Sequence, residues 1–368
     1  MILIFWQNIV SPHQLPYIQN IARVNNKLQV ILVAAEEMSA ARKRMGWGVE
    51  KISNINTVEI IVSPRNETIK LIYKKYPNAQ HFFSGLRANP TVFYSFKHSL
   101  NYDVKRHLIT EGPTFYLRPK FLHLIRTIFQ DKKYFKYIDK VFAIGEDARE
   151  WYRLWGFKPN TIIPFVYCVE NHNSIELNNR NNEPTLKLLF VGSLIKLKGI
   201  NNLLKKLSFL KTDIHLDIIG GGNELDNLKE IVNENNIQNK VSFIGVKTNY
   251  ETRSLMHNYD CLVLPSLYDG WGAVVNEGLM AGLFVICSDQ CGAKDLINKW
   301  NGIVFSNERK NNLLTALTYC RNNIDIIRAK RNKIKEWSKC IAPESISSYF
   351  SDVLSSQKVP IPPWEKDN

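Results

Sequence analysis

Residues 261–282 read CLVLPSLYDGWGAVVNEGLMAG, and this stretch predicts a strand, a loop and a helix. Its first four residues are apolar, as is typical of a strand that is buried on both faces of a parallel sheet. A loop follows in which glycines flank Trp271, and a helix is expected from about Val274 to Ala281. Such a unit is the building block of α/β proteins, so this stretch predicts an α/β fold.

The same alternation of short apolar runs and amphipathic stretches continues on both sides. In the second half of the chain we expect strands at Lys187–Val191, His215–Ile219, Lys240–Ile244, Cys261–Pro265 and Phe284–Ser288. The helices expected between them are Ile200–Leu210, Glu224–Asn235 and Tyr250–His257. In the first half we expect strands at Ile2–Trp6, Leu28–Ala34, Thr57–Val62, Gln80–Phe83, Thr91–Tyr94, His107–Thr110 and Lys140–Ile144.

A chain of 368 residues exceeds what one hydrophobic core usually organises. We therefore predict two Rossmann-like, doubly wound domains, at residues 1–170 and 185–340. The segment between Val169 and Thr185 is rich in Asn and has almost nothing to bury, which is typical of a linker. Apolar residues at helical spacing predict helices over 311–354, and we expect residues 341–368 to form a helix and tail that pack back on the first domain.

The composition excludes several classes of protein. The chain is 45% hydrophobic and 22% charged, close to the globular average, which excludes collagen-like, coiled-coil and wholly disordered chains. Its six cysteines include no CxxC pair, so we expect free thiols in a reducing compartment and no zinc site. We find neither an uncharged apolar window of about 18 residues nor a signal peptide, so we expect a cytoplasmic protein.

The positive charge of the chain is unevenly distributed. The first 184 residues hold 25 Lys and Arg against 15 Asp and Glu, whereas the remainder holds 23 against 19. Residues 117–140 read LRPKFLHLIRTIFQDKKYFKYIDK, a basic amphipathic segment that either lies on an anionic membrane or packs on its own sheet with a basic outer face. Arg42, Lys43 and Arg44 form a second basic patch or a solvated loop. A nucleic acid is the general alternative partner, but no nucleic-acid-binding motif accompanies the charge.

The loop within 261–282 has the residues of an anion site. Gly270 and Gly272 allow a ligand to approach the backbone closely, and the N–H groups of Gly272, Ala273 and Val274 would point at it from a helix start. This arrangement suits a phosphate. Upstream, the strand at 187–191 ends in a loop with Lys196 and Lys198, whose charges would neutralise a diphosphate in the same crevice.

Two acids in this stretch could face the same crevice. Glu277 lies eight residues after Asp269, about one turn into the expected helix, where its carboxylate could accept hydrogen bonds from sugar or ribose hydroxyls. Taken alone, Asp269 is more often a helix cap, Glu277 a solvated helix residue and a loop lysine a solubilising group.

Several motifs in order carry a resemblance to a known family. They are Phe190-Val-Gly-Ser-Leu with Lys198-Gly199, Leu216-Asp-Ile-Ile-Gly-Gly-Gly, Val241-Ser-Phe-Ile-Gly, Leu264-Pro-Ser, Asp269-Gly-Trp-Gly with Glu277-Gly-Leu-Met-Ala-Gly, and Gly292-Ala-Lys-Asp-Leu-Ile. This series, over about residues 186–300, resembles the donor domain of retaining family 4 glycosyltransferases of the GT-B fold, of the bacterial surface polysaccharide type.

The resemblance implies two Rossmann-like domains that face each other across a cleft and bind a nucleotide sugar, which we expect to be UDP-linked, without a metal or other cofactor. It implies that Lys198 contacts the donor diphosphate, that Glu277 holds the ribose, and that Asp269 touches the transferred sugar. The backbone at Val246 would read the base, and Trp271, between the two glycines, would be a further donor contact. Two positions depart from the family: the first acid is Asp rather than Glu, and Ser193 replaces an arginine, so Lys196 would supply the missing phosphate contact.

The first domain is harder to interpret. His13 follows the first expected strand, where the family usually has a glycine-rich loop, and Glu111 follows the strand at 107–110. Both lie where a doubly wound sheet places its ligands, so we predict contacts with the acceptor. A histidine between two prolines is more often a surface turn residue, and a glutamate at a strand end equally serves as a helix cap or a loop hydrogen-bond acceptor.

The sequence therefore predicts a hexosyltransferase that builds surface polysaccharide on a saccharide or lipid-linked saccharide acceptor, with contact to the inner membrane face through its basic domain. Two alternatives remain: a GT-B sugar-nucleotide epimerase or hydrolase, and a catalytically silent carbohydrate-binding protein. The glycines at 220–222 lack the spacing of a dinucleotide fingerprint, and no metal-binding or P-loop pattern appears.

Overall fold

The computed structural model describes residues 1–24, 28–38, 58–87, 89–113, 120–170, 183–210, 213–309 and 312–365. They form two compact units. The first unit contains the described residues up to Glu170 and those from Ile341 onwards, and the second contains those from 183 to Cys340. The basic patch at 42–44 and most of the expected linker lie outside the described residues.

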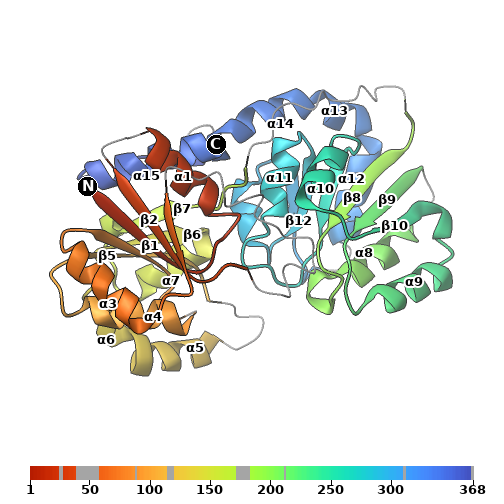
Figure 1. The fold of residues 1–368 in the computed structure, drawn as a ribbon. Helices are drawn as coiled ribbons and strands as arrows, with labels where there is room; N and C mark the ends of the chain where they lie inside the picture. Colours follow the sequence, from red (N-terminus) through yellow and green to blue (C-terminus); the bar gives the residue numbers. More distant parts are fainter. Residues whose placement is uncertain are drawn as a thin grey trace. The chain divides into compact units, whose positions relative to one another are not determined.

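The first unit is built on a parallel sheet of seven strands in the order β3-β2-β1-β4-β5-β6-β7 (Figure 1). The strands are β1 (Ile2–Ile9), β2 (Gln29–Glu36), β3 (Glu59–Val62), β4 (Gln80–Ser84), β5 (Lys105–Glu111), β6 (Lys140–Ile144) and β7 (Ile162–Phe165). The helices are α1 (Leu15–Val24), α3 (Asn66–Lys75), α4 (Pro90–Ser99), α5 (Lys120–Arg126), α6 (Lys132–Phe135) and α7 (Glu146–Leu154), with a π-helical turn at Thr127–Asp131. The strand order reverses between β1 and β4, which is where such sheets bind ligands.

The C-terminal helix α15 (Pro343–Ser355) completes the core of the first unit. It packs against α1, and Phe350 inserts into a cluster of rings whose centroids lie 4.9–6.1 Å from its own. These rings belong to Phe5, Tyr17, Phe82, Phe142 and Phe165. Because Phe350 is fully buried, the first unit depends on residues from the far end of the chain.

The second unit contains a parallel sheet of six strands in the order β10-β9-β8-β11-β12-β13. The strands are β8 (Leu186–Val191), β9 (Ile214–Ile219), β10 (Val241–Gly245), β11 (Cys261–Leu264), β12 (Phe284–Ser288) and β13 (Gly302–Phe305). The helices are α8 (Ile200–Leu207), α9 (Leu225–Glu234), α10 (Asn249–Met256), α11 (Val274–Met280), α12 (Asn312–Asn322), α13 (Ile324–Ala329) and α14 (Arg331–Trp337). The order reverses between β8 and β11, so the loops that follow these two strands meet at the switch point.

The structure confirms the predicted α/β class with two Rossmann-like sheets, but one expected strand is wrong. Residues Thr91–Tyr94 lie in helix α4. Pro90 occupies the first turn of this helix, and the side chain of Asn89 accepts a 2.8 Å hydrogen bond from the N–H of Thr91. This cap outweighs the strand preference of the β-branched and aromatic residues that follow. The edge strands β7 and β13 escaped prediction, because Pro164 interrupts the apolar run of β7 and β13 begins with Gly302.

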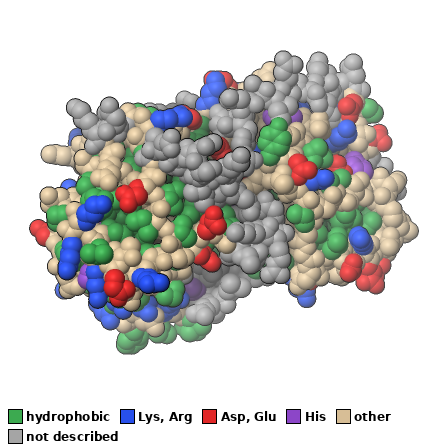
Figure 2. Space-filling view, viewed as in Figure 1, with side chains coloured by type: hydrophobic (Ala, Val, Ile, Leu, Met, Phe, Trp, Pro, Cys, Tyr) green, Lys and Arg blue, Asp and Glu red, His purple; other side chains and the backbone are tan. Residues whose placement is uncertain are grey.

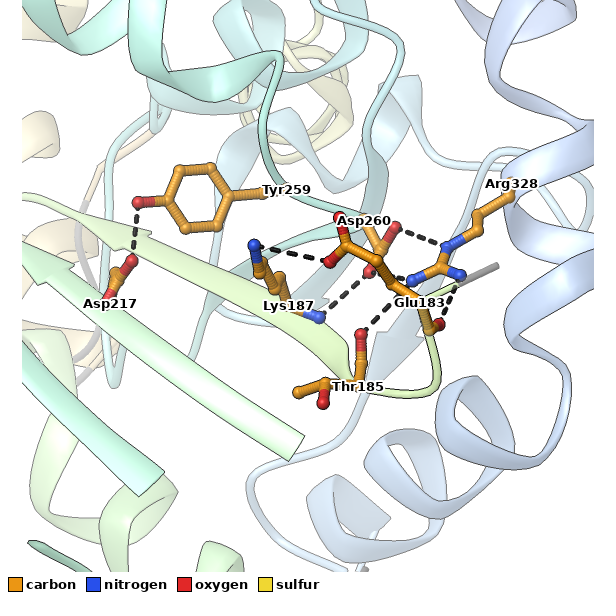
Figure 3. A network of polar contacts seen from close by, with 7 residues as sticks. All are labelled: Glu183, Thr185, Lys187, Asp217, Tyr259, Asp260 and Arg328. Carbon is orange, nitrogen blue, oxygen red and sulfur yellow. Dashed lines mark hydrogen bonds and ion pairs between the residues drawn. The ribbon is translucent and has the colours of Figure 1, made fainter. Parts of the chain in front are cut away.

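A buried ion pair lies at the amino ends of β8 and β11, the two strands at the switch point of the second unit, and joins them (Figure 3). Arg328 of α13 donates from Nε to Asp260 at 2.9 Å, and from its terminal nitrogens to the carbonyls of Glu183 and Thr185 at 2.7 and 3.2 Å. Asp260, directly before β11, also accepts from the N–H of Lys187 in β8 at 2.9 Å. The side chains of Arg328 and Asp260 are 4% and 0% exposed. The pair therefore ties a C-terminal helix to β8 and β11.

Replacing Arg328 with Met should lower the free energy of unfolding by about 3–5 kcal/mol, because the carboxylate of Asp260 would be left buried without its counter-charge. Urea unfolding followed by circular dichroism measures this loss. The control is Arg321→Met on α12, since Arg321 pairs at 4.0 Å with Asp213, whose side chain is exposed; its cost should stay below about 1 kcal/mol. Equal losses in the two variants would contradict a central role for Arg328.

Candidate functional site

The loops after β8 and β11 are held against each other at the switch point. The N–H of Leu267 donates to the carbonyl of Leu197 at 2.8 Å. Gly199 has a φ of +64°, and a Cβ there would lie 2.0 Å from the carbonyl oxygen of Pro265, so only glycine allows this approach. The approach brings Nζ of Lys198 to 2.5 Å from Oδ2 of Asp269. The two side chains predicted to flank a diphosphate sugar therefore form an ion pair that is 20% and 15% exposed.

The loop that carries Asp269 is also fixed to the loop after β12. The N–H of Asp269 donates to Gln290 at 3.0 Å, and its carbonyl accepts from Gly292 at 3.1 Å. Gly272 then turns the chain into α11 with a φ of +84°. A Cβ on Gly272 would lie 2.8 Å from Sγ of Cys291 and 3.4 Å from Oδ2 of Asp269. The start of α11 is therefore directly beside the Lys198–Asp269 pair.

The start of α11 has the backbone donors that an anion needs. Within the part of the chain that the structure describes, the N–H groups of Gly272, Ala273 and Val274 donate to no backbone carbonyl. The first carbonyls of this turn are already engaged, because Gly272 accepts from Val275 at 2.9 Å and Ala273 from Glu277 at 3.3 Å. A helix start next to a lysine is suited to a phosphate group.

The second acid, Glu277, lies in the first turn of α11 and pairs with an arginine from another helix. Its Oε1 accepts from Nε and Nη2 of Arg253 at 3.3 and 3.2 Å. The side chains of Arg253 and Glu277 are 15% and 12% exposed. The sequence showed no sign of this contact, because Arg253 lies 24 residues upstream, in the short polar helix α10.

The remaining predicted donor residues lie along the same edge of the sheet. The N–H of Leu194, next to the partly exposed Ser193, donates to Gly221 at 2.9 Å, and the N–H of Gly220 donates to Gly245 at 2.9 Å. Val246, which follows Gly245, is 49% exposed, and its Cγ2 would lie 2.9 Å from a Cβ on Gly221. The loops after β10, β9, β8, β11 and β12 thus form a continuous row of backbone. Lys196 is exposed on this row, and Gly270 is partly exposed.

Trp271 differs from the other predicted donor residues because its side chain lies inside the protein. It is 3% exposed, and its indole N–H donates to the side-chain oxygen of Asn276 at 2.8 Å. The structure thus gives Trp271 a role in supporting the loop between Gly270 and Gly272. A donor contact from its side chain stays a prediction.

One cluster in the second unit contains the residue types of a hydrolase triad but not the geometry. Nε2 of His215 lies 2.9 Å from Oγ of Ser242 and 3.1 Å from Oδ1 of Asp217. A triad needs the serine and the acid on opposite ring nitrogens, so that the acid orients the ring while the other nitrogen takes the proton. Asp217 also accepts from the hydroxyl of Tyr259 at 2.7 Å. This cluster is a polar network on the sheet and does not have the arrangement of a hydrolytic site.

In the first unit, Tyr167 brings the two predicted acceptor residues together. The ring of His13 lies 6.1 Å from the ring of Tyr167. The hydroxyl of Tyr167 is hydrogen-bonded to Glu111, and its pKa is raised well above the usual value, mainly by burial and then by the charge of Glu111. Gln14 adds a 3.4 Å hydrogen bond to Ser84 at the end of β4. This polar cluster lies at the carboxyl ends of β1, β4 and β5, and the sequence did not point to Tyr167.

The basic amphipathic segment exposes an apolar stripe, which we define as Phe121, Leu122, Ile125, Ile128 and Phe129. These five side chains are 43–77% exposed, whereas Thr127 is buried and Leu124 packs on the core. Exposed basic residues accompany the stripe, namely Arg126, Lys132, Lys133 and Lys136. Figure 2 shows hydrophobic and basic side chains at the lower edge, where Figure 1 places α5 and α6. None of the described helices has the length and hydropathy needed to cross a bilayer.

Comparison with known families supports the resemblance found in the sequence. Residues 173–336 match the family model described as glycosyl transferases group 1. A 4-α-N-acetylgalactosaminyltransferase of Campylobacter jejuni, named for a diphospho-undecaprenol-linked saccharide, is 28% identical over 181 residues, which are 47% of this chain and 49% of that protein. An uncharacterised glycosyltransferase of Haemophilus influenzae is 29% identical over 230 residues, 59% of this chain and 61% of that protein. The chain thus spans roughly half the length of these relatives.

Solved structures match over nearly the whole chain and show the fold. The lipopolysaccharide outer core galactosyltransferase WaaB superposes with a TM-score of 0.71 at 16% identity, covering 97% of this chain and 100% of that one. The Anabaena protein HepE, in complex with UDP, superposes with a TM-score of 0.72 at 13% identity, covering 96% and 100%. Both units therefore have the α/β architecture of GT-B glycosyltransferases.

Replacing Gly272 with Ala should destabilise the second unit by the cost of a positive φ, about 1–2 kcal/mol, plus a clash with Cys291 and Leu264 of about 1–3 kcal/mol. The matched control is Gly245→Ala, which has a φ of +82° and no atom within 4 Å of the added Cβ. Urea unfolding of both variants isolates the clash. A cost no greater for Gly272→Ala than for Gly245→Ala would contradict the close packing at the start of α11.

Proposed function

We propose that this protein is a metal-independent, retaining glycosyltransferase that transfers a hexosyl unit from a UDP-linked sugar to a saccharide or lipid-linked saccharide acceptor in cell-surface polysaccharide synthesis. The observation that carries the proposal is the Lys198–Asp269 pair beside the start of α11, at the switch point of the second unit. A cation, free backbone donors and a carboxylate in one place suit a sugar diphosphate.

Each group at this edge of the sheet has a distinct proposed task. Lys198 and the N–H groups at the start of α11 bind the diphosphate and stabilise the charge that develops on it as the sugar leaves. Asp269 accepts hydrogen bonds from sugar hydroxyls, and Glu277 does so from the ribose. The backbone at Val246 contacts the base. Ser193 and Lys196 lie on the β8 loop as further phosphate contacts.

Retention follows when the acceptor attacks the face of the sugar from which the diphosphate departs. The bond from C1 of the sugar to the phosphate oxygen breaks as the bond to the acceptor oxygen forms, and the departing diphosphate takes the acceptor proton. Such a step places most of the catalytic demand on leaving-group stabilisation, which is what Lys198 and α11 supply. In the first unit, Glu111 and His13, joined through Tyr167, would orient the acceptor hydroxyl.

The compared proteins support the substrate class. Solved structures similar in fold include HepE complexes with UDP and with UDP-glucose, and the Campylobacter relative is named for transfer to a lipid diphosphate-linked saccharide. Two other activities are separable by product. An epimerase or hydrolase would consume the donor without acceptor, and a silent carbohydrate-binding protein would bind sugars without releasing UDP.

The donor class is tested by thermal unfolding against UDP-, GDP- and ADP-sugars. Ligand binding to the native state raises the melting temperature, so we expect stabilisation by UDP-sugars above the other two. Lys198→Met should weaken UDP-sugar binding about 10- to 100-fold, because one charge-assisted hydrogen bond to the diphosphate is lost.

Lys205→Met is the control for lost charge, since Lys205 is exposed on α8. It should bind as the wild type does. If neither UDP nor any nucleotide sugar stabilises the wild-type protein, the proposed function is wrong; if Lys198→Met binds normally, the diphosphate lies elsewhere.

We further propose that the enzyme works at the inner membrane face and docks there through the apolar stripe. Five exposed apolar side chains flanked by Lys and Arg are the features of a helix that lies in the headgroup region of an anionic bilayer. A protein that stayed in bulk water would be expected to bury or replace such a stripe. A peripheral position also suits a lipid-linked acceptor.

Phe121→Ser combined with Phe129→Ser should reduce co-sedimentation with vesicles of phosphatidylglycerol about tenfold or more, because two inserted rings are lost. The control, Phe209→Ser, removes an equally exposed ring, 66% exposed, from the second unit. Vesicles of phosphatidylcholine alone should bind the wild type weakly, since they lack the charge that attracts the lysines. Equal binding by the double variant and the control would refute docking through the stripe.

A further inference from the structure

The contact between Arg253 and Glu277 brings an arginine from α10 to the acid on α11. Two nitrogens of the planar guanidinium converge on one carboxylate oxygen at 3.2 and 3.3 Å. Both side chains are more than four-fifths buried, so water screens the pair less than it would a surface pair. Two charge-assisted donors on Oε1 hold this oxygen more firmly relative to the guanidinium than a single donor would.

The backbone holds Arg253 firmly in place. Helix α10 begins with a capping box in which Thr248 accepts from the N–H of Glu251 at 3.2 Å, and Glu251 accepts from the N–H of Thr248 at 2.8 Å. Thr252 and Met256 anchor the helix, since they are 5% and 0% exposed. Arg253 is therefore positioned by a helix that begins at Asn249, three residues after Val246. Helix α10 therefore links the segment proposed to contact the base with the arginine that contacts Glu277, the acid proposed to bind the ribose.

The charges at the site explain why an acid there would need this partner. A carboxylate near a diphosphate repels it, and the repulsion is strong where solvent is scarce. Lys198 is already engaged by Asp269 at 2.5 Å. Arg253 offsets the charge of Glu277 locally, so the carboxylate accepts hydroxyl hydrogen bonds without adding negative charge to the pocket.

We propose that Arg253 is a positioning residue for nucleotide recognition: it orients and neutralises the carboxylate of Glu277 so that this carboxylate accepts the ribose hydroxyls of the donor. The inference rests on the proposed function and deepens it, because it assigns ribose selectivity to a pair of side chains. In this proposal Arg253 acts through Glu277 and is assigned no contact with the diphosphate or with the sugar that is transferred.

The test measures the binding of UDP, 2′-deoxy-UDP and 3′-deoxy-UDP by calorimetry. The wild type should prefer UDP over at least one deoxy analogue by about tenfold or more, since a lost hydroxyl leaves Glu277 without its partner. Arg253→Gln should weaken UDP binding about tenfold and largely abolish this preference. Arg253→Lys, which keeps the charge but not the planar pair of donors, should recover only part of the loss.

A double-mutant cycle distinguishes positioning from a general loss of structure. Arg253→Gln combined with Glu277→Gln should bind UDP no more weakly than Glu277→Gln alone, because the proposed task of Arg253 requires the carboxylate of Glu277. In transfer assays Arg253→Gln should raise the KM for the donor with kcat nearly unchanged. Arg321→Gln on α12, whose melting temperature is compared with that of Arg253→Gln, is the control for the loss of an arginine.

The outcomes separate this inference from the proposed function. If the wild type binds UDP but Arg253→Gln keeps the full preference for ribose, or if the two substitutions are additive, the positioning role is overturned and the proposed function stands. If the wild type does not bind UDP, both are overturned.

Discussion

The mostly buried ion pair between Lys198 and Asp269 depends on one property of parallel sheets. The order of strands reverses between β8 and β11, so the loops that follow these two strands leave the same edge side by side. Among the described strands of this sheet, β8 and β11 are the neighbours whose connections run outward to opposite halves of the sheet, β8 to β9 and β11 to β12. Gly199 approaches Pro265 so closely that the two loops are in contact. The opposite charges of Lys198 and Asp269 stabilise this contact. The geometry of every group around the start of α11 follows from this junction.

Buried residues that do not line the site hold its loops in place. Arg328 and Asp260 tie β8 to β11 at the ends away from the site, and Trp271 packs beneath the glycine loop with its indole N–H donated to Asn276. These residues determine where the loops begin and how they turn. Loops alone would be too mobile to hold a lysine and two acids in fixed positions, so the rigidity of the buried framework is what gives the site a defined geometry.

The two acids of the site each have a basic partner, but of different kinds. Lys198 is a compact cation on a flexible stem, so it can turn from Asp269 toward an arriving phosphate without a change in the fold. Arg253 presents a planar group from a capped helix and suits a fixed contact. We therefore expect the Lys198–Asp269 pair to separate when a ligand binds and the Arg253–Glu277 pair to persist. This difference agrees with the proposed function, in which the nucleoside diphosphate leaves as one product after each transfer and the site keeps its specificity for the nucleoside of the next donor.

The sequence by itself determined the α/β class, two Rossmann-like sheets and most strands, because apolar runs that alternate with amphipathic stretches are local patterns. It misassigned Thr91–Tyr94, where a cap and a proline outweigh strand preference, and it missed the edge strands β7 and β13. It also indicated Lys198, Asp269 and Glu277, since the glycines and charges around them lie at recognisable spacings. Only the tertiary structure decided that Arg253 contacts Glu277, that Tyr167 joins His13 to Glu111, and that Trp271 faces inward. Each of these contacts depends on how elements of the chain pack together in three dimensions. No local sequence pattern predicts such a contact.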